Sequence, residues 1–93
     1  RDKGVFIRSK NINVQKLLNQ DLDGKIGVGY TATKKIGNAV KRNKAKRIMR
    51  ELAKKILIKG KTNTYYVLIA KLSILDTKFK TLLEEMESII HVK

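Results

Sequence analysis

Hydrophobic and polar residues alternate along parts of this chain and recur at helical spacing along others, and the two patterns predict five elements. Residues 5–9 (VFIRS) are rich in β-branched and aromatic side chains, so residues 4–10 are predicted as a strand. Residues 25–33 alternate, which indicates a second strand with one apolar face and one small, flat face. Residues 64–70 (TYYVLIA) are almost continuously apolar, which is typical of a strand buried on both faces. Residues 11–24 are predicted as a polar connection that contains at most one helical turn.

Two longer segments carry apolar side chains at helical spacing. The first is capped by Asn38 and ends at Gly60. Its apolar stripe consists of Ala45, Ile48, Met49, Leu52, Ala53 and Ile56. The second opens at Asp76 or Thr77, and its stripe consists of Phe79, Leu82, Leu83, Met86, Ile89 and Ile90. Its glutamates (Glu84, Glu85 and Glu87) are predicted on the solvated side. The order of elements predicts an α/β (α+β) two-layer sandwich, in which a small mixed sheet has its helices on one face.

Length and composition narrow the class of protein. The 93 residues are 42% hydrophobic and include no proline and no low-complexity linker, so we expect a single domain over residues 1–93. No apolar run approaches the roughly 18 residues of a membrane span, so the chain is not expected to insert into a membrane. The chain has no cysteine, which fits a reducing, cytoplasmic location.

Basic residues are concentrated in one segment. The chain has 22 lysines and arginines against 8 acids, a net charge of +14. Residues 34–61 alone hold twelve of these basic residues and one acid, Glu51. These positive charges repel one another, and binding to a polyanion reduces the repulsion. The binding also releases counterions that are condensed on the polyanion, which favours the complex. Nucleic acid is therefore the favoured partner, with an anionic membrane surface as the main competitor.

The first helix is predicted to turn this charge outward. Opposite its apolar stripe lie Asn43, Arg47, Arg50 and Lys54, bordered by Arg42, Lys44 and Lys46. The planar guanidinium of arginine can hold two phosphate oxygens, and an asparagine can bond to a sugar or a base edge. A charged helix face is normally only solvated, but here Glu51 alone offers i,i+4 pairing, to Arg47 and Lys55. The missing alternation of sign favours a binding role.

Two features of the strands leave alternatives open. Phe6 and Arg8 share one face, where they could offer a stacking surface and a cation to unpaired nucleotides, or Phe6 could be a core residue. Gly27 and Gly29 either are tolerated bends or leave room for a helix or a nucleic-acid backbone. The remaining core candidates among the aromatic residues are Tyr30 and Phe79, which follow the core periodicity.

The sequence contains no pattern of residues that is typical of a catalytic site. His91 is the one histidine and has no evident partner, and Asp21 and Asp23 precede a glycine, as residues that shape a turn do. Metal motifs, nucleophile elbows and phosphate-cradling glycine loops are missing from the sequence. We therefore expect no catalytic residue and no metal or cofactor held tightly by the protein.

Residues 31–51, TATKKIGNAVKRNKAKRIMRE, resemble the signature of the bacterial ribonuclease P protein subunit, and the resemblance extends over most of residues 25–90. It implies a small basic partner of a catalytic RNA, and together the two cut the 5′ leader from precursor tRNA in a reaction that needs Mg²⁺. It also implies a ribosomal-protein-like fold with a left-handed βαβ crossover, although a right-handed crossover is the default.

The resemblance also assigns roles to individual residues. The family's motif for binding the catalytic RNA and nearby substrate maps onto Arg42, Asn43, Lys44, Lys46, Arg47 and Arg50, and Lys54 continues the same row. The family's leader-binding cleft maps onto Phe6 and Arg8, together with Lys34 and Lys35.

The chain departs from the family pattern at three places. Lys44 stands where arginine is common, and Arg8 stands where an aromatic residue is common. The family's N-terminal helix would precede Arg1, so we expect this domain to lack it. The alternative function is that of a basic ribosomal or other structural RNA-binding protein, and a DNA-binding helix is a third.

Overall fold

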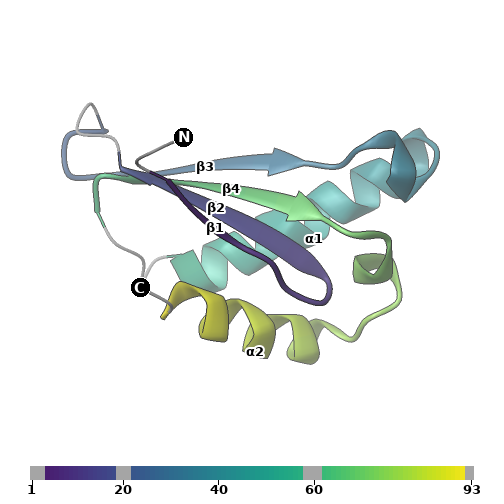
Figure 1. Ribbon diagram of the computed structural model, residues 1–93. Helices are drawn as coiled ribbons and strands as arrows, with labels where there is room; N and C mark the ends of the chain where they lie inside the picture. Colours follow the sequence, from purple (N-terminus) through teal and green to yellow (C-terminus); the bar gives the residue numbers. More distant parts are fainter. Residues whose placement is uncertain (1–3, 19–21, 58–61, 92–93) are drawn as a thin grey trace.

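One face of a four-stranded sheet is covered by two helices in a computed structural model that describes residues 4–18, 22–57 and 62–91 (Figure 1). The strands are β1 (Gly4–Ile7), β2 (Ile12–Leu18), β3 (Ile26–Thr31) and β4 (Thr64–Ala70). The helices are α1 (Ala39–Ile56) and α2 (Phe79–Ile90), preceded by the short 3₁₀ helices η2 (Lys34–Ile36) and η4 (Leu72–Leu75) respectively. The two-layer α+β sandwich predicted from the sequence is confirmed.

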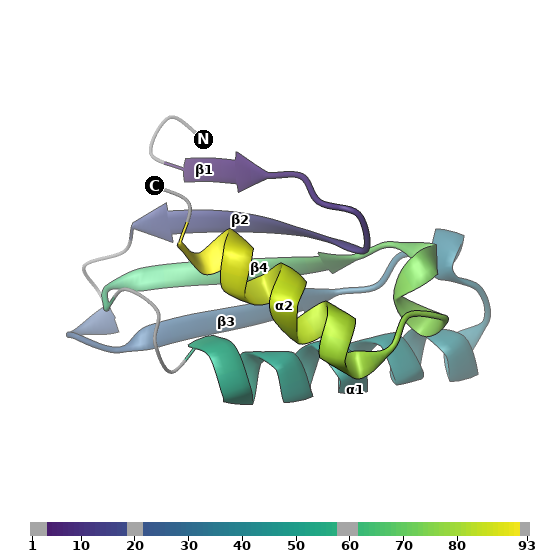
Figure 2. The same cartoon turned by 90° about the horizontal axis from the view of Figure 1, so that it is seen from below.

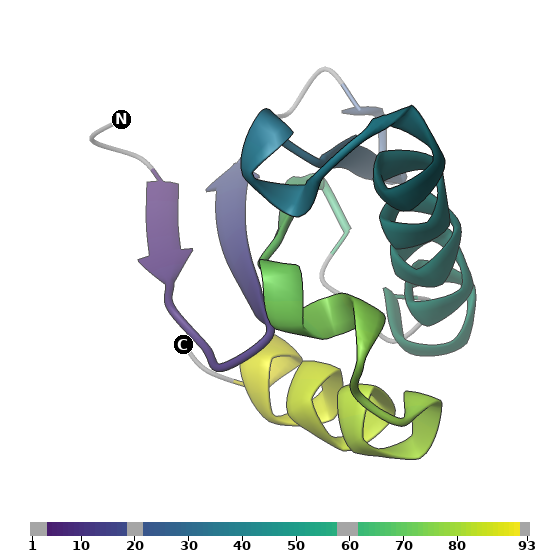
Figure 3. The ribbon, with the colours of Figure 1, turned by 90° about the vertical axis from the view of Figure 1, so that its right-hand side faces the viewer.

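The order of the strands is β1-β2-β4-β3. Strand β2 pairs antiparallel with β1 and β4, whereas β3 pairs parallel with β4. Helix α1 joins the two parallel strands, β3 and β4. In Figure 1 both strands run from left to right, β4 lies below β3, and α1 lies behind the sheet. This arrangement, seen end-on in Figure 3, is a left-handed crossover, the uncommon hand that the family resemblance implied.

Strand β2 corrects the sequence prediction, because residues 12–18 are a central strand and not a polar connection. Ile12 and Val14 are fully buried against the helices. Lys16 lies on the same side and donates from Nζ to the carbonyl oxygen of Ile90 at 3.2 Å, so the end of α2 accepts a hydrogen bond from its ammonium group. Strand β1 is also shorter than predicted and ends at Ile7.

The core lies between the sheet and the two helices, which share one side of the sheet in Figures 2 and 3. Its fully buried large side chains include Tyr66 and Leu68 of β4, Met49 and Leu52 of α1, and Leu82 and Met86 of α2. The predicted helix stripes are confirmed, and Tyr30 and Phe79 pack against this core. Strand β4 alternates between buried and half-buried side chains, so the predicted burial on both of its faces is wrong.

The ends of α1 follow from local chemistry. Asn38 caps the helix as predicted, and its side-chain oxygen accepts from the backbone N–H of Lys41 at 3.0 Å. The helix ends at Ile56 with Leu57 as its C-cap, and the predicted terminator Gly60 lies outside the described residues. Helix α2 begins at Phe79, later than predicted, after η4 and a short connection.

A buried asparagine joins three parts of the fold. Asn11, which is 1% exposed, donates from its backbone N–H and its side-chain Nδ2 to the two carboxylate oxygens of Glu85 at 2.8 and 2.7 Å. Its Oδ1 accepts from the hydroxyl groups of Ser73 at 2.6 Å and Thr77 at 3.1 Å. Glu85 was predicted on the solvated side of α2, and the structure corrects this, because its carboxylate holds α2 to the turn before β2.

The same contacts shift the acidity of Glu85. Burial alone would raise its pKa, but hydrogen bonds from Ser9, Asn11 and Ile12 stabilise the carboxylate and lower the pKa below its ordinary value of 4.5. A lowered pKa in the folded state adds stability that is complete above the unfolded value and is lost as the pH falls through the folded one. The stabilisation by Glu85 should therefore disappear in acid.

Glu85→Gln should lower the free energy of unfolding by about 1 kcal/mol at neutral pH, a modest loss because the carboxylate is partly exposed. The difference from the unchanged chain should shrink as the pH falls below 4.5. Urea unfolding measured at several pH values tests this. Glu84→Gln, on the exposed side of the same helix, is the matched control. A Glu85→Gln deficit that stays constant with pH would contradict the role assigned to the carboxylate.

Candidate nucleic-acid interface

The outer face of α1 carries seven polar residues, which we call the basic row: Arg42, Asn43, Lys44, Lys46, Arg47, Arg50 and Lys54. Five of them are exposed, and Arg42 and Lys46 are half-buried. The opposite side of the helix is held by Ala45, Met49 and Leu52, which are fully buried. Because these anchors fix the rotation of α1, the basic row faces away from the core, as the helical spacing predicts.

Little in α1 neutralises the basic row. Its one acid, Glu51, lies 3.9 Å from the Nζ of Lys54 across an exposed i,i+3 pair. The sequence had suggested Arg47 and Lys55 as its partners, one turn away in each direction. An exposed pair at this distance contributes little to stability. The surface of α1 therefore keeps a strong positive potential that a polyanion would relieve.

Two arginines of the basic row also contact the protein. The Nη1 of Arg42 donates to the carbonyl oxygen of Gly37 at 3.2 Å, which steadies the side chain at the start of α1. The guanidinium of Arg50 lies 6.0 Å from the centroid of the Tyr30 ring. Arg50 therefore contributes to packing along β3 as well as to charge, whereas Arg47 is a simpler probe of the charge alone.

The side of the sheet away from the helices, the open sheet face, carries one row of residues in register across all four strands. This row consists of Phe6, Gln15, Val67 and Gly29. Phe6 is 46% exposed, and the guanidinium of Arg8 lies 5.5 Å from the centroid of its ring. The core interpretation of Phe6 is therefore wrong, because Ile7 is the residue that packs against the core. None of the residues in the four strands is acidic.

The predicted cleft residues lie at one end of the sheet but at its two edges. Strands β1, β3 and β4 run in the same direction, so their last residues lie at the end where α1 begins (Figure 3). Arg8 follows β1, whereas Lys34 and Lys35 follow β3 and are exposed. Three strand spacings separate the two edges, a distance of about 14 Å. The open sheet face lies between these positive groups.

Sequence reasoning assigned no role to Tyr65, whose side chain lies over Gly27 and Gly29 of β3. A methyl carbon at Gly27 would lie 2.4 Å from the Tyr65 ring, and one at Gly29 would lie 2.6 Å from its hydroxyl oxygen. The glycines therefore admit a tyrosine side chain from β4, and the interpretation that they leave open space is wrong. The nearly continuous apolar run of β4 did not show that Tyr66 faces the core while Tyr65 faces away.

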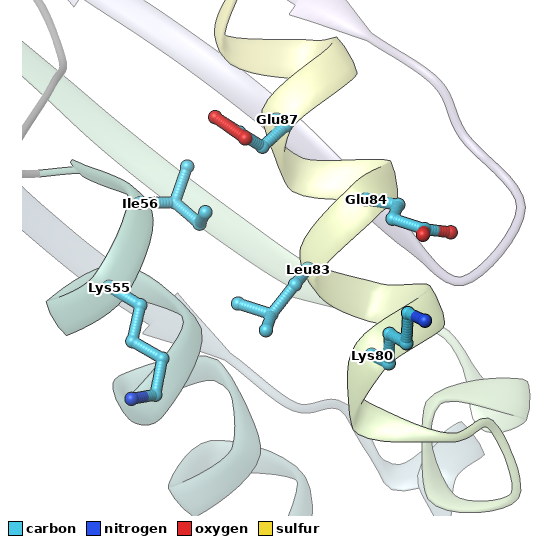
Figure 4. A pocket seen from close by; sticks show the side chains of 6 residues that line it. All are labelled: Lys55, Ile56, Lys80, Leu83, Glu84 and Glu87. Atoms are coloured by element: carbon cyan, nitrogen blue, oxygen red, sulfur yellow. The ribbon is translucent and has the colours of Figure 1, made fainter.

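Among the residues that the structure describes, no group of three or more His, Asp or Glu side chains could hold a metal ion. His91 is exposed at the end of α2, Asp23 lies in a turn with a φ of 54°, and Asp21 lies outside the described residues. An open groove of about 310 Å³ runs between α1 and α2 (Figure 4). Its lining mixes charges of both signs with apolar side chains: Lys55, Ile56, Lys80, Leu83, Glu84 and Glu87. Among the described helices, none combines the length and apolar character needed to cross a membrane.

Comparison with known proteins gives one consistent family. The family model described as Ribonuclease P matches residues 2–92. The ribonuclease P protein component of Thermoanaerobacter sp. is 30% identical over 91 residues, which cover 95% of this chain and 78% of the relative. That of Caulobacter vibrioides is 46% identical over 59 residues, or 62% of this chain. The chain spans only 40% of the length of the Caulobacter relative.

Solved structures agree with the sequence comparison. The ribonuclease P protein of Staphylococcus aureus superimposes with a TM-score of 0.77 at 26% identity, over 95% of this chain and 79% of that one. The ribonuclease P protein of Thermotoga maritima superimposes with a TM-score of 0.83 at 20% identity, over 99% of this chain and 86% of that one. The second likeness concerns the fold alone.

Proposed function

This chain belongs to the ribonuclease P protein family, and we propose that it is the protein subunit that helps a catalytic RNA remove the 5′ leader of precursor tRNA. In this proposal the polypeptide binds and positions RNA, and the RNA subunit performs the hydrolysis in the cytoplasm. The observation that carries the proposal is the basic row, which places seven polar or cationic side chains on one helix face with a single acid beside them.

The basic row is the proposed contact with the catalytic RNA. Its arginines can each hold two phosphate oxygens, and Asn43 can bond to a ribose or a base edge. Its anchoring through a buried helix face fixes the backbone from which these side chains project, so binding has to order the side chains but not the helix. Lys34 and Lys35 extend the same positive surface from η2 toward the sheet.

The open sheet face is the proposed contact with the single-stranded leader. Unpaired nucleotides are bound by aromatic stacking together with cations, and the exposed Phe6 ring with Arg8 beside it offers both. The absence of acidic residues from all four strands removes the repulsion that a phosphate backbone would meet. This surface provides a physical reason for preferring precursor tRNA to mature tRNA, because only the precursor carries a leader.

Catalysis is proposed to come from the RNA, with Mg²⁺ bound by RNA phosphates rather than by this chain. Purified protein without the RNA subunit should therefore leave precursor tRNA intact at any magnesium concentration. The measurement is the mapping of 5′ ends after long incubation with protein of high purity. Cleavage that is abolished by a point substitution in the polypeptide would contradict the proposal and would assign the chemistry to the protein.

A further inference from the structure

We propose that Tyr65 forms a second stacking platform on the open sheet face, so that the leader is held at two separated nucleotides. This inference rests on the proposed function and extends it, because it assigns a role to a residue outside the family motif and predicts which nucleotide that residue holds.

The register of the sheet places the two aromatic groups at opposite ends of one track. Phe6 begins the cross-strand row on β1, and Gly29 ends it on β3. The Tyr65 side chain comes from β4 and lies along β3, and its hydroxyl oxygen reaches the position of Gly29. The two aromatic groups are therefore separated by up to about 14 Å across the strands, too far apart to stack on the same base.

The surface between the aromatic groups suits a nucleotide chain. Gln15 and Val67 occupy the row between them, so a side-chain amide is available for a base edge or ribose, beside an apolar contact. Four-stranded sheets with exposed aromatic residues commonly stack two or three successive bases of single-stranded RNA. Arg8 at the β1 edge and the lysines of η2 at the β3 edge supply cations at the two ends of the track.

The position of α1 gives the track a direction. Helix α1 and η2 lie next to the β3 edge, whereas Phe6 lies on the far edge of the sheet. If the basic row holds the catalytic RNA, the leader leaves the cleavage site on the α1 side and crosses the sheet toward β1. Tyr65 then holds the nucleotide nearer to the cut, and Phe6 holds one farther along the leader.

The test uses the assembled ribonucleoprotein and a series of precursor tRNAs, each with one 2-aminopurine in the leader, because stacking quenches the fluorescence of this base. Two separated positions should be quenched. Tyr65→Leu should restore the fluorescence of the position nearer to the cut and weaken precursor binding about tenfold. Phe6→Ala should restore only the farther position. Tyr65→Phe keeps the ring and should behave like the unchanged protein.

A second variant moves the tyrosine without removing it. Gly29→Ala places a methyl group against the Tyr65 hydroxyl, so it should displace the ring and restore fluorescence at the position that Tyr65→Leu affects. Circular dichroism confirms that each variant is folded. If Tyr65→Leu keeps both quenched positions while Phe6→Ala loses one, the second platform is refuted and the leader site remains. If neither variant changes any position, the leader-binding surface itself is refuted. If Tyr65→Leu restored the fluorescence of the farther position and Phe6→Ala that of the position nearer to the cut, the proposed direction of the leader across the sheet would be refuted.

Discussion

Phe6→Ala should lower the affinity of the assembled ribonucleoprotein for precursor tRNA about tenfold, while its affinity for mature tRNA stays nearly unchanged. Stacking of one base on an aromatic ring contributes roughly 1–3 kcal/mol, and a tenfold change in affinity corresponds to about 1.4 kcal/mol. Only the precursor has unpaired nucleotides to place on the Phe6 ring. The quantity to measure is therefore the ratio of the two dissociation constants.

The matched control for Phe6 is its neighbour Val5. Val5 is 41% exposed on the same short strand, but it points to the other side of the sheet. Val5→Ala should cost about as little stability as other exposed substitutions and leave the ratio of affinities unchanged. Equal losses for both tRNA species in a folded Phe6→Ala protein would contradict leader binding at this face.

Arg47→Ala should weaken binding to the catalytic RNA and reduce the slope of log K against log salt concentration by about one unit. A side chain that neutralises one phosphate releases about one counterion from the RNA, and the slope of log K against log salt concentration is proportional to the number of counterions released. Arg47 is exposed on the side of α1 opposite the buried stripe, so its loss should change the free energy of unfolding by less than about 0.5 kcal/mol. Arg50→Ala should cost more stability, because Arg50 also contacts Tyr30.

The control for Arg47 is an exposed lysine outside the basic row. Lys80→Ala removes the same formal charge from α2, on the rim of the groove in Figure 4. If the row makes specific phosphate contacts, this variant should change the salt slope much less than Arg47→Ala does. Equal slopes for the two variants would mean that only net charge attracts the RNA. A lower melting temperature with an unchanged slope for Arg47→Ala would make the row a structural feature.

Helix α1 could be predicted from the sequence because its signals are local. Asn38 is a capping residue, the apolar stripe keeps helical spacing over several turns, and the charges lie on the other side. Helix α2 shows the same agreement between pattern and burial. The exposed positions of the basic row followed directly, since a buried stripe fixes the direction of every other side chain on the helix.

Strand β2 could not be predicted in the same way. Val14, Leu17 and Leu18 fit a helical turn as well as they fit a strand, and Lys16 interrupts the apolar face. The choice is made by hydrogen bonds to β1 and β4, and the pairing with β4 joins residues that are far apart in the sequence, such as Ile12 with Ala70 and Leu18 with Thr64. Propensity in strands depends on such neighbours more than on the segment itself.

The contacts of Glu85 and Tyr65 were missed for a related reason. Glu85 lies between Glu84 and Glu87, which the sequence pattern also places on the solvated side, and its partner Asn11 is 74 residues away. Tyr65 and Tyr66 are adjacent in an apolar run, so only the register with β3 shows which ring lies over the glycines. Sequence periodicity gives the direction of a side chain within its element, whereas these contacts depend on how elements meet.

Reconstitution with the catalytic RNA is the most direct test of the proposed function. Cleavage of precursor tRNA by the cognate RNA should be measured at a low magnesium concentration, with and without this protein. We expect the protein to restore cleavage at the mature 5′ end under conditions in which the RNA alone is nearly inactive, because its cations replace part of the charge screening that Mg²⁺ supplies. Cleavage that remains the same with and without the protein would contradict its role as a ribonuclease P subunit.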